Sequence, residues 1–103
     1  MTTSLPSNKT FVVDLDGTLC EEVATFDRSM AKPYTDRIVN LNRLFYTGNK
    51  IIIFTSRSWA EYDMTGEWLM NNGVEYDLLI CGKPIGDYWI DDRSVQPSLL
   101  EEI

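Results

Sequence analysis

The chain contains no histidine, and this absence excludes more chemistry than any other feature of its composition. Without histidine there is no Ser-His-Asp triad, no histidine-activated cysteine and no histidine-ligated metal. A general acid or base must therefore be Asp, Glu, Lys, Tyr or Cys. Because Asp and Glu together outnumber each of these other residue types, the search for a site begins with carboxylates.

Cysteine is also scarce, since Cys20 and Cys81 are the only two. Two thiols are too few for a metal knuckle, and they fit a reduced, cytoplasmic protein. Each follows a strand-like apolar run. We therefore expect both to be buried as small apolar residues rather than to act in redox chemistry.

No long hydrophobic run is present. No stretch approaches the ~20 apolar residues of a membrane-spanning helix, and the N-terminal residues lack an apolar signal core. A chain of 103 residues is long enough for one domain and little else. We expect residues 1–9 to form a flexible tail, residues 10–103 to form a single domain, and no membrane to be involved.

Positive charge is in short supply. Nine Lys and Arg residues face sixteen Asp and Glu residues, which gives a formal net charge of −7. An acidic surface argues against electrostatic binding to a long nucleic acid. It does not argue against a small phosphorylated substrate held in a local pocket, and clustered carboxylates can bind a cation.

Residues 11–19, with the sequence F-V-V-D-L-D-G-T-L, carry the strongest signal. The apolar start predicts a buried strand that ends in Asp14 and Asp16. Side chains two residues apart in a strand lie on the same side. Two such acids at the end of a buried strand need a neutralising partner.

The rest of the chain alternates between apolar strand patterns and helical patterns. A loop or small hairpin is expected between them at 20–32, and the last residues, 97–103, favour one or two helical turns. The predicted strands cover residues 11–13, 51–54, 77–80 and 88–90, and the predicted helices run from Pro33 to Gly48 and from Ser58 to Gly73. This order predicts an α/β fold, a three-layer Rossmann-like parallel sheet with helices on both faces.

Ligands of such sheets bind beyond the carboxyl ends of the strands, and polar clusters follow every predicted strand. Four carboxylates in one site would repel one another unless a divalent cation were present, and oxygen ligands favour Mg²⁺. The clusters are Asp14 with Asp16, Thr55 with Arg57, then Lys83, and finally Asp91 with Asp92.

These residue types fit phosphoryl transfer through an aspartyl-phosphate. Asp14 would attack phosphorus, Asp16 would act as acid and then base, and Lys83 would neutralise charge. Thr55 would donate a hydrogen bond to the phosphoryl group. Ser56 is a rival for this last role.

Further substrate contacts are expected from Gly17 and Ser56. Arg57 either binds the substrate or pairs with a carboxylate on the surface, and the sequence leaves both open. The substrate is expected to be a small phosphorylated molecule such as a sugar phosphate.

With these residues in this order, the chain resembles the haloacid dehalogenase-like (HAD) phosphohydrolases. Their first motif is similar to residues 14–18, and Asp-x-Asp-Gly-Thr after an apolar strand is specific. Thr55 looks like the second motif, Lys83 like the third and residues 90–92 like the fourth. The resemblance covers residues 11–93. It implies a phosphatase with the first Asp as nucleophile and the second as acid and base.

The resemblance also implies a Mg²⁺ ion. Its ligands would be Asp14, the backbone carbonyl of Asp16 and an acid of the fourth motif. Asp91 would be the direct ligand, with Asp92 in support, although the sequence does not assign the two securely.

Most members of this superfamily carry an inserted cap domain, for which this chain has no room. It resembles small capless proteins associated with polysaccharide or capsule biosynthesis. More loosely, residues 55–57 resemble the second motif of polynucleotide kinase-type phosphatases. Without a cap, we expect the flap at residues 20–32 or a neighbouring subunit of a homo-oligomer to cover the site.

Three other functions stay open. A capless site could accept a phosphate on a nucleic-acid end or another large molecule. A phosphoacceptor module like a response-regulator receiver is disfavoured by the order of the acidic motifs. The third is a non-catalytic binding protein on the same scaffold.

Overall fold

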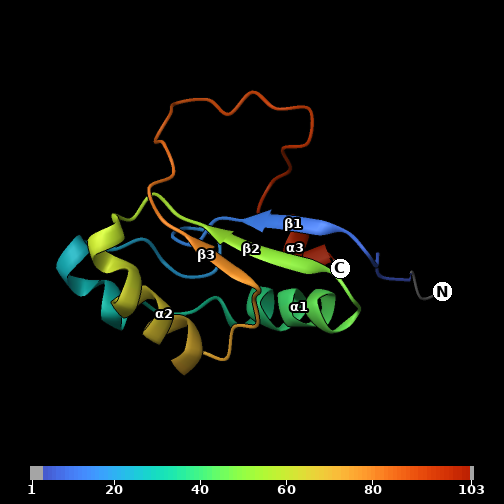
Figure 1. Ribbon diagram of the computed structural model, residues 1–103, viewed down its shortest axis with the longest axis horizontal. Helices are drawn as coiled ribbons and strands as arrows, with labels where there is room; N and C mark the ends of the chain where they lie inside the picture. The colour runs from blue at the N-terminus through green and yellow to red at the C-terminus, as the bar shows by residue number, and fades with distance from the viewer. Residues whose placement is uncertain (1–3, 103) are drawn as a thin grey trace.

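The computed structural model describes residues 4–102 as an α/β arrangement around one parallel sheet. Its strands pair in the order β1-β2-β3 (Figure 1). The elements are β1 (Thr10–Val13), the 3-10 helix η1 (Thr25–Met30), α1 (Thr35–Tyr46), β2 (Lys50–Phe54), the 3-10 helix η2 (Trp59–Glu61), α2 (Tyr62–Asn71), β3 (Leu78–Ile80) and α3 (Leu99–Glu102).

Helix α1 forms where the apolar spacing predicts it. Ile38, Leu41 and Leu44 recur at intervals of three residues and are buried against the sheet. The helix ends just before Gly48, whose φ of +97° is a conformation that glycine adopts without strain. The second helical segment begins as predicted after Ser58, which forms a capping box with Glu61.

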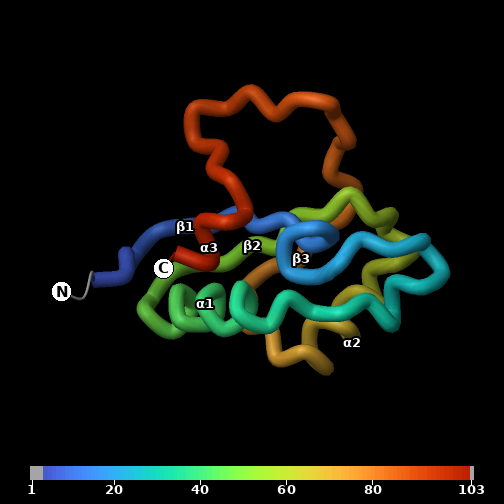
Figure 2. Tube along the Cα trace, turned by 180° about the vertical axis from the view of Figure 1, so that it is seen from behind, coloured from blue at the N-terminus to red at the C-terminus, as the bar shows by residue number. Residues whose placement is uncertain are grey.

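The sheet is packed by helices on one face. Figures 1 and 2 both show α1 and α2 on the same side of the strands. Ile51, Ile53 and Leu79 are buried on that side, while Val12 and Leu78 are exposed. The parallel sheet is as predicted. The sequence predicts helices on both faces of the sheet, but α1 and α2 both lie on one face.

The segment after β3 differs most from expectation. Residues 81–98 contain no helix or strand in the part of the chain that the structure describes, and they arc away from the sheet (Figure 2). The predicted strand at 88–90 is therefore wrong. A strand needs a hydrogen-bonded neighbour, and this segment lies off both sheet edges, with Ile90 97% exposed.

The chain returns to the core at α3. Leu100 is buried in the hydrophobic cluster, and the Asn40 amide of α1 donates a hydrogen bond of 2.7 Å to its carbonyl oxygen. The helical turn predicted within residues 97–103 is present. Its docking fixes the far end of the 81–98 segment beside α1.

The N-terminal segment is in contact with the domain. The Asn49 amide donates to the Pro6 carbonyl at 2.7 Å, and the Asn8 N–H donates to the Gly48 carbonyl at 3.1 Å. Residues 1–3 of the predicted tail lie outside the described residues. These hydrogen bonds attach the chain just before β1 to the turn that precedes β2.

Candidate active site

Most of the predicted site residues follow the three strands, at the edge of the sheet where the strands have their carboxyl ends. Asp14 and Asp16 follow β1, Thr55 and Arg57 follow β2, and Lys83 follows β3. Because the strands are parallel, their carboxyl ends meet, and ion pairs join the three connections there.

Asp14 and Lys83 form the first ion pair. The Lys83 Nζ lies 3.6 Å from an Asp14 carboxylate oxygen, and the Asp14 side chain is 36% exposed. Burial raises the pKa of Asp14 above its ordinary value, and the hydrogen bond from the Leu15 backbone and the charge of Lys83 oppose this rise only in part. The negative charge on Asp14 is therefore incompletely balanced, which favours an additional cation.

Lys83 is positioned by backbone pairing beyond β3. Its N–H donates to the Thr55 carbonyl at 2.9 Å, and the Gly82 N–H donates to the Arg57 carbonyl at 2.9 Å. The Lys83 ammonium also lies 5.0 Å from the centre of the Trp89 ring, which gives it a cation–π contact. These contacts hold the ammonium near Asp14.

Asp16 and Arg57 form the second ion pair. Arg57 Nη2 donates to Asp16 Oδ1 at 2.7 Å, and Nε donates to Oδ2 at 2.9 Å. This is the two-pronged geometry that guanidinium and carboxylate groups favour. The Arg57 side chain is fully buried, and its Nη1 donates to Thr65 at 3.1 Å. Arg57 thus pairs with a carboxylate, which is one of its two predicted roles, but the pair lies in the interior and not on the surface.

Cys20 contributes to the same network. Its thiol lies 3.7 Å from Asp16 Oδ1 and 3.8 Å from the Leu15 carbonyl oxygen. Burial, together with the negative charge of Asp16, raises the pKa of Cys20 to about 12. The thiol is therefore neutral and can donate its single proton to either oxygen. Cys20 and Cys81 are both buried, as predicted.

The two candidate hydroxyls differ in access. Thr55 is fully buried, and its hydroxyl oxygen accepts a hydrogen bond from the Arg57 N–H at 3.2 Å. Ser56 is exposed. The structure therefore gives Thr55 a role in shaping the loop, and it leaves Ser56 as the hydroxyl that solvent reaches.

Gly17 lies in the turn that closes the β1 end. Its φ is +80°, and its N–H donates to the Cys20 carbonyl at 2.8 Å. A residue with a side chain would be strained in this conformation. Gly17 is exposed, so a ligand can contact its backbone. Its N–H is already bonded to Cys20 and is therefore not a free donor for that ligand.

Asp91 and Asp92 do not join the other acids. Both lie in the exposed 81–98 segment, where Asp91 accepts a hydrogen bond from the Arg93 N–H and Asp92 lies 3.8 Å from the Arg93 side chain. Among residues 4–102, no group of three or more acidic, cysteine or histidine residues is placed to hold a metal ion. The predicted cluster of four carboxylates is not formed, because the strand expected to deliver Asp91 and Asp92 does not form.

The remaining acids still fit Mg²⁺ in the mode this ion prefers. Mg²⁺ usually takes one or two protein carboxylates and completes its shell with water and substrate phosphate. Asp14 offers a partly exposed carboxylate with unbalanced charge, whereas both oxygens of Asp16 are already bonded to Arg57. The residues fit an ion held by Asp14 beside Asp16, and they do not form an all-protein cage.

A clamp that local sequence patterns do not predict holds the flap at residues 20–32. Arg28 of η1 donates to both carboxylate oxygens of Glu61 at 2.8 and 3.0 Å. The flap's base is closed by the Glu21 N–H, which donates to the Lys32 carbonyl. The capping-box pattern identifies Glu61 as a helix cap, but no local signal links it to a residue 33 positions earlier.

The fold and site define a class: a Rossmann-like α/β protein with an acidic and basic cluster at the carboxyl edge of its sheet. A crystal structure of a structural-genomics target from Vibrio cholerae is 32% identical to this chain with a TM-score of 0.80. The match covers 92% of this chain and 89% of that one. The chain belongs to the same family as this Vibrio cholerae protein.

Two further structures share the fold. Chains from the Pnkp1/Rnl/Hen1 complex, described in one case as an RNA repair complex, are 23% and 24% identical, with TM-scores of 0.66 and 0.64. The matches cover 89% and 98% of this chain, but only 34% and 31% of those chains. No protein-family model and no curated protein matches the chain. Within residues 4–102, no helix is both long and apolar enough to cross a bilayer.

Proposed function

We propose that this protein is a Mg²⁺-dependent HAD-type phosphatase that hydrolyses a small phosphomonoester through an aspartyl-phosphate on Asp14. The contrast between the two acids after β1 carries the proposal. The Asp14 side chain is 36% exposed and lies beside Lys83, whereas the Asp16 side chain is 10% exposed and is bound by Arg57. Asp14 is therefore the acid that a substrate can reach.

The chemistry divides between these two acids. An Asp14 oxygen attacks phosphorus and the bond from phosphorus to the leaving oxygen breaks. Asp16, which enters this step protonated on the side of Oδ2 that Arg57 does not use, gives its proton to the leaving oxygen and becomes a carboxylate. Asp16 then takes a proton from water, whose oxygen attacks phosphorus and releases Asp14 and inorganic phosphate. Asp16 Oδ1 accepts from Arg57 Nη2 and lies within hydrogen-bond distance of the Cys20 thiol, whereas Oδ2 accepts from Arg57 Nε and keeps a second lone pair for these transfers.

Positive charge at the phosphoryl group has a source within the chain. The Lys83 ammonium is held beside Asp14 and would contact the phosphoryl oxygens, while Ser56 would donate its exposed hydroxyl. When bound, Mg²⁺ would supply further positive charge to the same oxygens. Asp14 would hold that ion with Asp16 beside it, and Asp91 and Asp92 stay candidate ligands from the motif resemblance alone.

The test is Asp14→Asn, which preserves shape and removes the nucleophile. We expect phosphate release from a small phosphomonoester to fall by about a thousandfold or more, with no loss of fold. Asp87→Asn, which changes an exposed acid of the 81–98 segment, is the matched control. Phosphate release and circular dichroism of both variants are compared with those of the wild-type protein.

Wild-type turnover by Asp14→Asn would overturn the proposal. A wild-type aspartyl-phosphate that persists for hours without turnover would instead identify a phosphoacceptor module. Absence of Mg²⁺ binding by calorimetry would favour a non-catalytic binding protein.

A phosphorylated RNA end is the alternative substrate. It is favoured by the fold shared with chains of the Pnkp1/Rnl/Hen1 RNA repair complex. It is disfavoured by the net charge of −7, which repels a polyanion. Phosphate release screened across sugar phosphates, nucleotides and phosphorylated oligonucleotides distinguishes the two substrate classes.

A further inference from the structure

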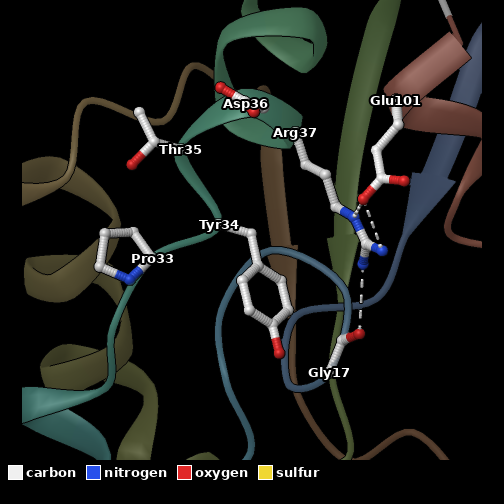
Figure 3. A pocket seen from close by; sticks show the side chains of 7 residues that line it. All are labelled: Gly17, Pro33, Tyr34, Thr35, Asp36, Arg37 and Glu101. Atoms are coloured by element: carbon white, nitrogen blue, oxygen red, sulfur yellow. Dashed lines mark hydrogen bonds and ion pairs between the residues drawn. The ribbon is translucent and has the colours of Figure 1, made fainter.

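A cavity of about 450 Å³ lies beside the turn that carries the candidate catalytic acids. Its size is within the range of small-molecule pockets. Gly17 lies at one side, and Tyr34, Thr35 and Arg37 come from the start of α1 and the residue before it (Figure 3). Glu101 of α3 faces Arg37, so three separate segments build the cavity.

The cavity is close enough to Asp14 to hold another part of the same small substrate. Gly17 follows Asp14 by three residues, and three residues span at most about 11 Å even when fully extended. A substrate with its phosphate at Asp14 can therefore place its remaining atoms against Gly17 and the residues opposite it.

The charge of Arg37 is already balanced within the protein. Its Nε and Nη2 lie 3.1 Å from Glu101 Oε1, and its Nη1 donates to the Thr18 carbonyl at 3.1 Å. The guanidinium also lies 5.1 Å from the centre of the Tyr34 ring. Arg37 is thus held in place by partners on several sides, with its side chain only 17% exposed.

The cavity as a whole is rich in acid. Among the described residues that line it, Arg37 is the one cation, against two carboxylates from Asp36 and Glu101, and because Arg37 pairs with Glu101 the charge of Asp36 is in excess. A second anionic group of a ligand would meet like charge there, which is unfavourable. Hydroxyl groups suit the same lining, because carboxylates accept hydrogen bonds, guanidinium donates them, and the Tyr34 and Thr35 hydroxyls do both.

We propose that this cavity binds the uncharged, hydroxyl-rich part of the substrate, the ring of a sugar monophosphate whose phosphate is its only charged group. The proposal rests on the phosphatase function proposed above and narrows its substrate class. Asp36 and Glu101 accept hydrogen bonds from sugar hydroxyls, while Arg37 fixes Glu101 in position. A sugar acid, with its own carboxylate, is a poor substrate for the same site.

The kinetic test removes the negative charge of the cavity one residue at a time. We expect Glu101→Gln and Asp36→Asn to lower kcat/KM for a hexose 6-phosphate by about tenfold, since each variant weakens a hydrogen bond between a sugar hydroxyl and a charged group. Hydrolysis of p-nitrophenyl phosphate, which has no sugar hydroxyls, should change little. Glu102→Gln, at the neighbouring exposed acid outside the cavity, is the matched control and should change neither.

Because Glu101 also ties α3 to α1, Tyr34→Phe serves as a second variant that removes only a hydroxyl. It should lower kcat/KM for the hexose phosphate and leave the thermal midpoint unchanged. Equal losses for the hexose phosphate and p-nitrophenyl phosphate in all three cavity variants would overturn the proposal. So would a preference of the wild-type protein for a phosphorylated sugar acid over the neutral sugar phosphate.

A binding experiment separates this proposal from the proposed function. Titration of the wild-type protein with an unphosphorylated hexose should shift the amide signals of Gly17 and Arg37 in ¹H–¹⁵N spectra, and Glu101→Gln should weaken the shifts. Phosphate release without such shifts would overturn the sugar site and leave the phosphatase standing. Such shifts without phosphate release from any monoester would support the sugar site and overturn the phosphatase.

Discussion

Arg57 is the residue on which the arrangement of the acids depends. Its guanidinium is fully buried and contacts both oxygens of Asp16, so the orientation of that carboxylate is fixed by a fork with two separate donors. Thr65 of α2 accepts a third hydrogen bond from Arg57. The orientation of the proposed acid and base is thus coupled to the packing of α2 against the sheet.

Arg57→Lys keeps the positive charge and loses the fork. We expect kcat for a small phosphomonoester to fall by about 10- to 100-fold, the usual effect of losing a partner that orients a functional group. KM should change little, because Arg57 is buried and does not face solvent. Steady-state kinetics and the thermal midpoint of the variant measure the two effects separately.

Arg93→Lys, at a side chain 88% exposed, is the control for this exchange and should have no effect. An unchanged kcat in Arg57→Lys would mean that the orientation of Asp16 does not limit turnover. A raised KM with normal kcat would instead place Arg57 among the groups that bind substrate.

Some of these residues could be predicted from sequence and others could not. The places of Asp14 and Asp16 after β1 and of Lys83 after β3 follow from the apolar runs that precede them, whereas the period of two does not apply to the two acids, because β1 ends at Val13. The pairing of Arg57 with Asp16 spans 41 positions, and nothing in the residues next to either one specifies the other. Such pairs are set by the packing of whole elements, which local patterns do not encode.

At the scale of elements, the clamp between η1 and η2 makes the flap part of the folded domain. The side chains of Arg28 and Glu61 are 20% and 15% exposed, and they join η1 to η2 across 33 positions of the chain. Arg28 Nε is a buried donor with no partner among the described residues, so the clamp itself is the main stabilising contact of this side chain.

Glu61→Gln should therefore destabilise the protein in a manner that depends on pH. Burial raises the pKa of Glu61, but hydrogen bonds from Arg28 and Ser58 outweigh it and hold the pKa below its ordinary value of 4.5. A lowered folded pKa contributes stability above the unfolded value, and this stability is lost as pH falls through the folded value. We expect a loss of about 1 kcal/mol at neutral pH that shrinks below about pH 4.5.

Urea unfolding of both proteins over this pH range measures the difference in the free energy of unfolding. Glu67→Gln, at an exposed acid of α2, is the control and should unfold like the wild-type protein at every pH. A difference for Glu61→Gln that stays constant through the acidic range would show that the charge of Glu61 is not what stabilises the flap.

The elements also show where sequence patterns reach their limit. The predictions of α1 and β2 are both confirmed. Ile38, Leu41 and Leu44 of α1 are buried against the sheet to which β2 belongs. Residues 88–90 have an equally apolar composition, but three residues make few hydrogen bonds and need an edge to pair with. Whether an edge is available depends on the path of the whole chain, and the pattern alone does not contain that path.

Residues 81–98 should be the first segment that proteases cleave. Tyr88 is 87% exposed and the Arg93 side chain 88%, and backbone outside helices and strands opens easily. We expect limited chymotrypsin to cut first near Tyr88 and limited trypsin to cut first after Arg93, as mass spectrometry of early fragments would show. First cuts within α1 or α2 would contradict the exposed path of this segment.

The same digestion tests the metal prediction for Asp91 and Asp92, which lie between these cleavage sites. Slower cleavage in the presence of Mg²⁺ and phosphate would support a role for these acids as ligands. Equal rates with and without Mg²⁺ and phosphate would contradict it.

At the scale of the whole molecule, net charge decides between the two substrate classes. With a formal charge of −7, the surface repels a polyanion such as RNA, while a small monoester carries too little charge to be excluded. The acidic lining of the cavity beside Gly17 acts in the same direction at short range. Both effects favour the monophosphate of an otherwise uncharged sugar over a phosphorylated RNA end.

Salt dependence makes this argument measurable. Between about 0.01 M and about 0.15 M salt the Debye length shortens from about 30 Å to about 8 Å, so repulsion between the protein and an RNA chain is screened. We expect kcat/KM for a phosphorylated oligonucleotide to start below that for a hexose phosphate and to rise with salt. The hexose phosphate, measured at constant Mg²⁺, is the control and should change much less. Proteins that bind nucleic acid by neutralising phosphates lose affinity as salt increases, because they no longer gain from counterion release. A kcat/KM for the oligonucleotide that is higher at low salt and falls as salt is added would therefore identify an RNA end as the substrate.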